Sequence, residues 1–117
     1  MKTLSNKTAL VVGASGGIGS AVVKRLCDEG MKVVMSARNR ERLEKKAEDF
    51  KLAAGSYVIL PADSSDFYHV DQLFAEIRKR FKGLDLVVIA SGGYDSLELE
   101  LPLKEASAVF QKMVAIN

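Results

Sequence analysis

The sequence predicts an α/β fold in which a doubly wound parallel sheet carries helices on both faces. Apolar runs rich in β-branched residues alternate four times with stretches whose apolar residues recur at helical spacing. The turn after the first apolar run holds four glycines within seven residues. The composition, 48% hydrophobic and 27% charged, is typical of a globular domain. A length of 117 residues suits one domain and is too short for two.

The first expected strand, Thr8–Val12, is almost without polar atoms, as in a central parallel strand covered on both faces. The glycine-rich turn over 13–19 lets the backbone approach a ligand closely, because glycine lacks Cβ and adopts positive φ. Ile18, Val22 and Leu26 recur at helical spacing, so a helix begins as the glycines end. Its first N–H groups and positive dipole end are expected to face an anion held in the turn.

The rest of the chain continues the alternation. The other expected strands are 31–37, 57–60 and 84–90, and the other expected helices are 39–53, one from Asp66 as N-cap to Gly83, and one from Pro102 onward. Residues 91–100 are expected to be a loop. Right-handed crossovers then predict the strand order 3-2-1-4, with a ligand crevice at the carboxyl ends of the strands.

Charge and cysteine content argue against several classes of protein. Basic residues exceed acidic ones by only two and are interleaved with them, so nucleic acid is not an expected partner. Cys27 is the only cysteine and is expected to be buried or half-buried in a reducing, cytoplasmic setting. No apolar run is long enough to span a membrane, which indicates a soluble protein. The single histidine, His69, is expected to face solvent, so no metal site is expected.

The glycine spacing is Gly13-x-x-x-Gly17-x-Gly19, which differs from the fingerprint Gly-x-Gly-x-x-Gly and lacks the Gly-Lys-Ser/Thr of a phosphate loop. A tight strand-to-helix connection without a ligand is the alternative reading. This spacing after a buried first strand resembles the short-chain dehydrogenase/reductase family, whose turn reads Thr-Gly-x-x-x-Gly-x-Gly. Val12 stands in place of the threonine. The resemblance implies a Rossmann-like fold that binds a nicotinamide dinucleotide.

The segment after the second expected strand indicates which dinucleotide is bound. No acid precedes Glu41 there, whereas Arg38 supplies a guanidinium that pairs bidentately with phosphate. In the family a basic residue at this place marks a preference for NADP, and Arg38-Asn39 is similar to that pattern. Alternatively, Arg38 and Arg40 only solvate a helix start, although a helix N-terminus disfavours cations. The prediction is NADPH in preference to NADH.

The resemblance assigns further residues to the site. Asp63 matches the family's aspartate that accepts a hydrogen bond from the adenine amino group, and Asn117 matches an asparagine that helps the catalytic lysine hold a water. The segment 89–92 reads Ile-Ala-Ser-Gly where the family carries Asn-Asn-Ala-Gly, so both asparagines are missing. The full expected cofactor site comprises Gly13, Ser15, Gly16, Gly17, Ile18, Gly19, Arg38, Asn39, Asp63, Ser64, Ala90, Ser91 and Gly92.

The catalytic half of the family pattern is not found in this sequence. The family's reaction needs a tyrosine with a lysine four positions on. Here Tyr57, Tyr68 and Tyr94 are followed at that offset by Pro, Gln and Glu. Residues 1–117 are therefore expected to be the cofactor-binding half of an NADP-dependent oxidoreductase that transfers hydride at a carbonyl or alcohol carbon. The sheet is expected to be truncated before strand 5, and the half to be inactive alone.

Two other readings stay open: a non-catalytic α/β module that binds a nucleotide or a partner protein, and a pure scaffold. Self-association is also expected. The apolar strand 84–90 would present an unpaired edge to a second chain. The helix from Pro102 resembles one that contributes to a four-helix dimer interface in the family.

Overall fold

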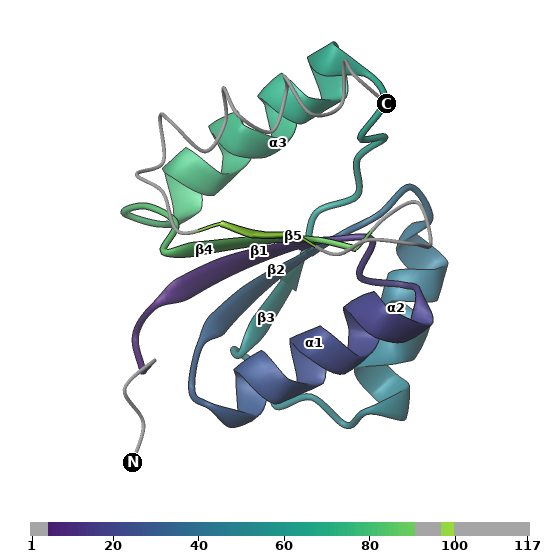
Figure 1. The fold of residues 1–117 in the computed structure, drawn as a ribbon, viewed down its shortest axis with the longest axis vertical. Helices are drawn as coiled ribbons and strands as arrows, with labels where there is room; N and C mark the ends of the chain where they lie inside the picture. Colours follow the sequence, from purple (N-terminus) through teal and green to yellow (C-terminus); the bar gives the residue numbers. More distant parts are fainter. Residues whose placement is uncertain (1–4, 91–96, 100–117) are drawn as a thin grey trace.

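The structure, a computed structural model, describes residues 5–90 and 97–99 and shows a three-layered α/β arrangement (Figure 1). The helices Gly17–Asp28 and Arg40–Asp49 cover one face of the sheet, and the helix Phe67–Arg80 covers the other. In chain order the elements are β1 (Thr8–Val12), α1 (Gly17–Asp28), β2 (Lys32–Ser36), α2 (Arg40–Asp49), β3 (Tyr57–Ile59), α3 (Phe67–Arg80), β4 (Leu86–Ile89) and β5 (Leu97–Leu99). The predicted helix from Pro102 lies outside the described residues.

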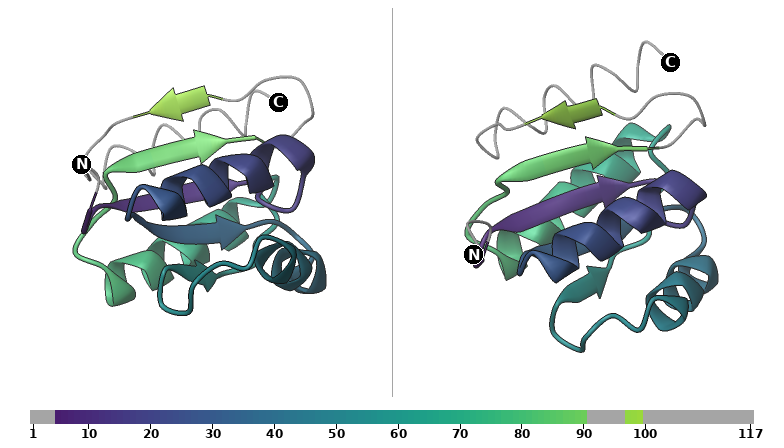
Figure 2. Two further views of the ribbon diagram at one scale, coloured as in Figure 1. Left: turned by 90° about the horizontal axis from the view of Figure 1, so that it is seen from below. Right: turned by 60° about the horizontal axis from the view of Figure 1, so that its bottom comes forward.

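The sheet has the order β3-β2-β1-β4-β5, which confirms the predicted order 3-2-1-4 (Figure 2). Strands β1 to β4 all run parallel. Val12, the last residue of β1, lies opposite Ser36 of β2 and Ile89 of β4. The carboxyl ends of three neighbouring strands therefore meet at one edge, where a ligand crevice was predicted.

The far edge of β4 differs from the prediction. A loop was expected over 91–100, yet β5 pairs antiparallel with β4 and places Val87 opposite Leu99 and Ile89 opposite Leu97. The expectation of an unpaired β4 edge is therefore wrong for these residues. The segment Leu97-Glu98-Leu99 alternates apolar and polar residues, as a strand does, but three residues are too few for that pattern to stand out from a loop.

A second difference concerns α2, predicted over 39–53. The helix ends at Asp49, because Phe50 is its C-cap and Lys51 adopts a left-handed φ of 54°. The N–H of Leu52 then donates to the Ala47 carbonyl at 3.0 Å. The turn thus satisfies a carbonyl at the helix end.

Two apolar cores lie on opposite faces of the sheet, and β1 contributes to both. Ala9 and Val11 pack with α1 and α2, whereas Leu10 and Val12 pack with α3. All four are buried, so both faces of β1 are covered as its sequence predicted. Phe74 and Ile77 of α3 are among the largest fully buried side chains.

Cys27 is half-buried near the amino-terminal edge of the sheet, as predicted. Burial raises the pKa of its thiol, and the Sγ atom lies 3.8 Å from the Ser56 carbonyl oxygen. None of the helices in the described part of the chain has the length and apolar character that a membrane crossing requires.

Candidate functional site

The glycine-rich turn is held against the end of β2. The N–H groups of Gly13 and Ala14 both donate to the carbonyl oxygen of Ser36, at 2.9 and 3.2 Å. Gly13 has a φ of 84°, which a residue with a Cβ adopts only at a cost. Its carbonyl accepts from the N–H of Gly16 at 3.2 Å, which closes the turn before α1 begins.

Two glycines at the start of α1 differ in what surrounds them. A Cβ added to Gly19 would lie 2.0 Å from the Gly13 carbonyl oxygen, so only glycine allows the helix to pack this closely on the turn. A Cβ added to Gly17 would meet no protein atom within 4 Å. Gly19 is therefore required by the fold itself, whereas Gly17 faces open space.

The amino-terminal end of α1 has no side-chain cap. Its N-cap is Gly16, no side chain accepts a hydrogen bond at this cap, and the first turn carries no acidic residue. Unpaired N–H groups and the positive end of the helix dipole favour an anion at such a position. The turn and the start of α1 therefore form an electropositive surface.

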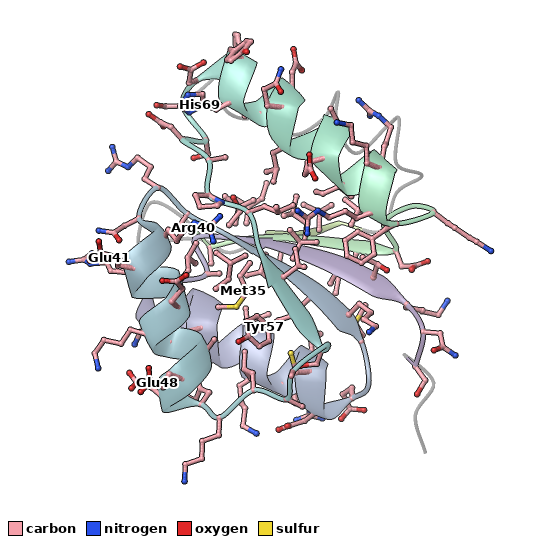
Figure 3. The ribbon with its side chains drawn as sticks, turned by 180° about the vertical axis from the view of Figure 1, so that it is seen from behind. Met35, Arg40, Glu41, Glu48, Tyr57 and His69 are labelled. Atoms are coloured by element: carbon pink, nitrogen blue, oxygen red, sulfur yellow. The ribbon has the colours of Figure 1, made fainter. Side chains whose placement is uncertain are left out.

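A cavity of about 740 Å³ opens beside this electropositive surface, at the carboxyl ends of β1, β2 and β3. It is lined by Val12, Gly13, Ser15, Ala37, Arg38, Asn39, Arg40, Glu41, Arg42, Ala62 and Ser64. Figure 3 shows Arg40 and Glu41 on the first turn of α2, which forms one side of this region. Three guanidinium groups against one carboxylate make the lining cationic.

The start of α2 is fixed by Asn39, whose side-chain oxygen accepts from the N–H of Arg42 at 3.1 Å. Asn39 is thus the N-cap of α2 as well as a residue of the cavity wall. Arg40 lies 3.8 Å from Glu44 one turn further along the helix. Arg38 precedes the cap and is exposed.

The segment after β3 forms a tight turn around Asp63. One carboxylate oxygen of Asp63 accepts from the hydroxyl of Ser65 at 2.6 Å and from its N–H at 2.9 Å. These two hydrogen bonds lower the pKa of the Asp63 carboxyl, and the charge of Arg38 lowers it further. Asp63 itself does not line the cavity, but its neighbours Ala62 and Ser64 do.

His69 on the first turn of α3 contacts this turn (Figure 3). Its side chain is 49% exposed, in keeping with the predicted solvent-facing position. However, its Nδ1 accepts a hydrogen bond from the backbone N–H of Asp63 at 3.3 Å, a contact that the sequence did not predict. Asp66 was predicted to cap α3, and its carboxylate accepts from the N–H groups of Tyr68 and His69 at 2.9 and 3.4 Å.

The predicted site residues fall into three groups. The cavity brings together Gly13, Ser15, Arg38, Asn39 and Ser64. Around it lie Gly16, Gly17, Ile18 and Gly19 at the start of α1, Asp63 in its turn, and Ala90, whose N–H donates to the Val12 carbonyl at 2.8 Å. Ser91, Gly92 and Asn117 lie outside the described residues.

Sequence reasoning did not assign several wall residues to the site: Val12, Ala37, Arg40, Glu41, Arg42 and Ala62. Their common signal is position, because each lies within a few residues of a strand's carboxyl end. Among the described residues no cluster of histidine, cysteine and acidic side chains could hold a metal ion.

Comparison with known proteins identifies this architecture. The family model described as short chain dehydrogenase matches residues 7–117. The chain belongs to the short-chain dehydrogenase family. This confirms the resemblance drawn from the spacing of Gly13, Gly17 and Gly19.

Two relatives illustrate the similarity in sequence. An uncharacterized oxidoreductase of Staphylococcus aureus is 38% identical over 92 residues, which are 79% of this chain and 39% of that protein. The short chain dehydrogenase/reductase dpchG of Colletotrichum higginsianum is 36% identical over 85 residues, 73% of this chain and 32% of that protein. The chain therefore spans about a third to two fifths of the length of these relatives.

Two solved structures show the same fold. A short chain dehydrogenase from Bacillus anthracis superposes with a TM-score of 0.72 at 22% identity and covers 78% of this chain and 36% of its own. The structure of YwfH, an NADPH dependent reductase involved in bacilysin biosynthesis, gives a TM-score of 0.66 at 34% identity and covers 71% of this chain and 34% of its own.

Proposed function

We propose that residues 1–117 are the cofactor-binding half-domain of an NADP-dependent short-chain dehydrogenase that transfers hydride at a carbonyl or alcohol carbon. The observation that carries this proposal is the cationic cavity lined by Arg38, which adjoins the uncapped amino-terminal end of α1. NADP needs both features, because its pyrophosphate and its 2′-phosphate are separate anions. One similar protein, YwfH, is described as NADPH dependent.

The described residues fit the parts of NADP. The open space at Gly17 and the N–H groups of α1 suit the pyrophosphate, with Ser15 as a further donor. Arg38 and Asn39 suit the 2′-phosphate, since guanidinium groups pair bidentately with phosphate. We propose that Asp63 and Ser64 contact the adenine. We also propose that Ile18, which is 56% exposed at the start of α1, contacts the part of the cofactor that passes this helix end.

Bound NADP would supply the hydride chemistry, and the part of this chain proposed to approach the nicotinamide side is Ala90, Ser91 and Gly92. Asn117 is proposed as a participant in the proton relay of the complete family site. Because the sequence contains no Tyr-x-x-x-Lys, we expect this 117-residue chain to bind cofactor without turning over substrate. The predicted cytoplasmic location also stays a proposal, which the lone Cys27 supports.

Separate titrations of the protein with NADPH and with NADH, each followed by the cofactor's own fluorescence, test the cofactor preference. We expect the wild-type chain to bind NADPH more tightly, and Arg38→Ala to weaken NADPH binding about 10- to 100-fold, the range for a charge-assisted hydrogen bond in a partly exposed site. NADH affinity should change little. Arg25→Ala is the matched control, because Arg25 lies in the last turn of α1 and does not line the cavity. Equal affinities for the two cofactors would contradict the role of Arg38.

Self-association, predicted through strand 84–90 or the last helix, needs one adjustment as a proposal. The edge of β4 is occupied by β5 over Val87–Ile89, so a second copy would pair on the outer side of β5 or through the helix predicted from Pro102. Light scattering at about 100 μM, in the range where unpaired edges associate, should report a dimer. A monomer at that concentration contradicts the proposal.

A further inference from the structure

One contact near the cavity has no role in the proposed function: the hydrogen bond between His69 and the Asp63 turn. The backbone N–H of Asp63 donates to His69 Nδ1 at 3.3 Å. The residues on either side of Asp63, Ala62 and Ser64, line the cavity. His69 does not line the cavity itself, and its hydrogen bond to Asp63 connects it to the turn that does.

Four other hydrogen bonds, made by Ala62, Ser65 and Asp66, also hold the turn, and none of them replaces the bond to His69. The N–H of Ala62 donates to the Ala37 carbonyl at 3.0 Å and fixes the side nearer β2. Ser65 bonds to the Asp63 carboxylate, and the N–H of Asp66 donates to the Asp63 carbonyl at 3.0 Å. The bonds of Ser65 and Asp66 lie within the turn, so among the described contacts His69 is the one that joins Asp63 to a side chain of α3.

The hydrogen bond requires a neutral imidazole. Nδ1 accepts only when it carries no proton, which places the proton of the neutral ring on Nε2. That atom lies 4.0 Å from Asp66 Oδ2. A second proton on the ring would turn Nδ1 into a donor that faces another donor, the Asp63 N–H, and the bond would be lost.

The groups around His69 are mostly acidic. Asp63 and Asp66 approach it from the turn and the helix start, and Glu76 lines the same shallow pocket from the next turns of α3. The ring of Tyr68 lies 6.3 Å away between ring centres. The nearby carboxylates therefore attract the protonated ring, and the Asp63 N–H repels it. Protonation is expected to move the His69 side chain away from the Asp63 N–H.

We propose that His69 is a positioning residue for nucleotide binding: its neutral imidazole holds the Asp63 turn against the cavity, and nucleotide affinity falls when the ring is protonated. This inference rests on the proposed function, because it takes the cavity to be the NADP site. It adds a pH dependence to that site, carried by the only histidine in the chain.

Two variants separate the acceptor from the titration. In His69→Asn the amide oxygen can occupy the place of Nδ1 and accept from Asp63, but it does not titrate. In His69→Leu the acceptor is lost at every pH. Because the side chain is half exposed, neither variant is expected to unfold the protein.

The measurement is the dissociation constant of NADP⁺ by calorimetry at pH 7.5 and pH 5.5, on the wild type and both variants. The 2′-phosphate of the ligand also takes up a proton in this range, and His69→Asn measures that background. We expect wild type and His69→Asn to bind equally at pH 7.5, and the wild type to bind about three- to tenfold more weakly than His69→Asn at pH 5.5, as the loss of one neutral hydrogen bond allows. His69→Leu should be weaker by a similar factor at both pH values.

Two results would overturn the inference: an unchanged ratio of wild type to His69→Asn at the two pH values, or wild-type affinity in His69→Leu. NADP⁺ that fails to bind any of the three proteins would instead overturn the proposed function. The amide resonance of Asp63 in the ligand-free chain distinguishes these cases. It should shift between the two pH values in the wild type and stay fixed in His69→Asn.

Discussion

At the scale of single residues, we expect substitution of Gly19 to affect folding stability and substitution of Gly17 to affect cofactor binding. Gly19→Ala should destabilise the protein by about 1–3 kcal/mol or more, because its Cβ would lie 2.0 Å from a backbone oxygen that cannot move aside freely. Urea unfolding measures this loss. Gly17→Ala is the control: it should keep or slightly raise stability while weakening NADPH binding, since its Cβ enters only the space proposed for pyrophosphate. Equal stability of the two variants would contradict this assignment.

Asp63 gives a pH prediction at the same scale. Hydrogen bonds from Ser65 lower the pKa of the Asp63 carboxyl in the folded protein, so the ionised form stabilises the fold. That contribution is present above the unfolded pKa of about 4 and is lost as the pH falls through the lower folded value. In Ser65→Ala the pKa of Asp63 should move back toward its ordinary value. A carboxyl titration followed by NMR checks this, and an unchanged pKa would show that the hydrogen bond from the Ser65 hydroxyl does not lower it, because the backbone N–H of residue 65 still donates in this variant.

Individual residues also show what the sequence can and cannot predict about the site. Arg38, Asn39 and Ser64, which were predicted to bind the cofactor, line one cavity, because strand ends in a parallel sheet meet at one edge; their contact with a cofactor stays a prediction. The contact between His69 and Asp63 was not predictable. It joins residues six positions apart through the shape of one turn, and no spacing rule describes that shape.

At the scale of elements, the cap of α3 supports the turn that borders the cavity. Asp66→Ala should cost about 1 kcal/mol of stability, because two N–H groups at the helix start lose their acceptor. Thermal unfolding measures the loss. Asp66→Asn retains an acceptor at the cap and should stay within a few tenths of a kcal/mol of the wild type. If the two variants unfold alike, the charge of Asp66 rather than its capping oxygen supports the helix.

Elements also differ in how far their sequence predicts them. The bounds of β1 are those predicted, because five buried residues form an apolar run between clear turn signals. The three-residue β5 was missed, because its position depends on the exposed edge of β4 rather than on its own pattern. Local sequence thus predicts the interior of the sheet better than its margin.

At the scale of the whole molecule, stability rests on a core on each face of the sheet. Phe74 is fully buried in the α3 core, so Phe74→Ala should cost about 3–5 kcal/mol. Since a typical domain is stable by roughly 5–15 kcal/mol, this one change should populate the unfolded state measurably in low urea. Phe67 on the same helix is 51% exposed, and Phe67→Ala should change stability by no more than about 0.5 kcal/mol. Similar losses in both variants would contradict the two-core description.

The alternation of β1 between the two cores has a consequence for how the molecule opens. Neither helix layer can detach without exposing one side of β1, the strand that leads into the glycine-rich turn over 13–19. Amide hydrogens of β1 should therefore exchange only through global unfolding. All of them should show the same free energy of opening, independent of which helix frays first. In such a molecule bound nucleotide would slow exchange on both sides of the sheet at once, even though it contacts a single edge.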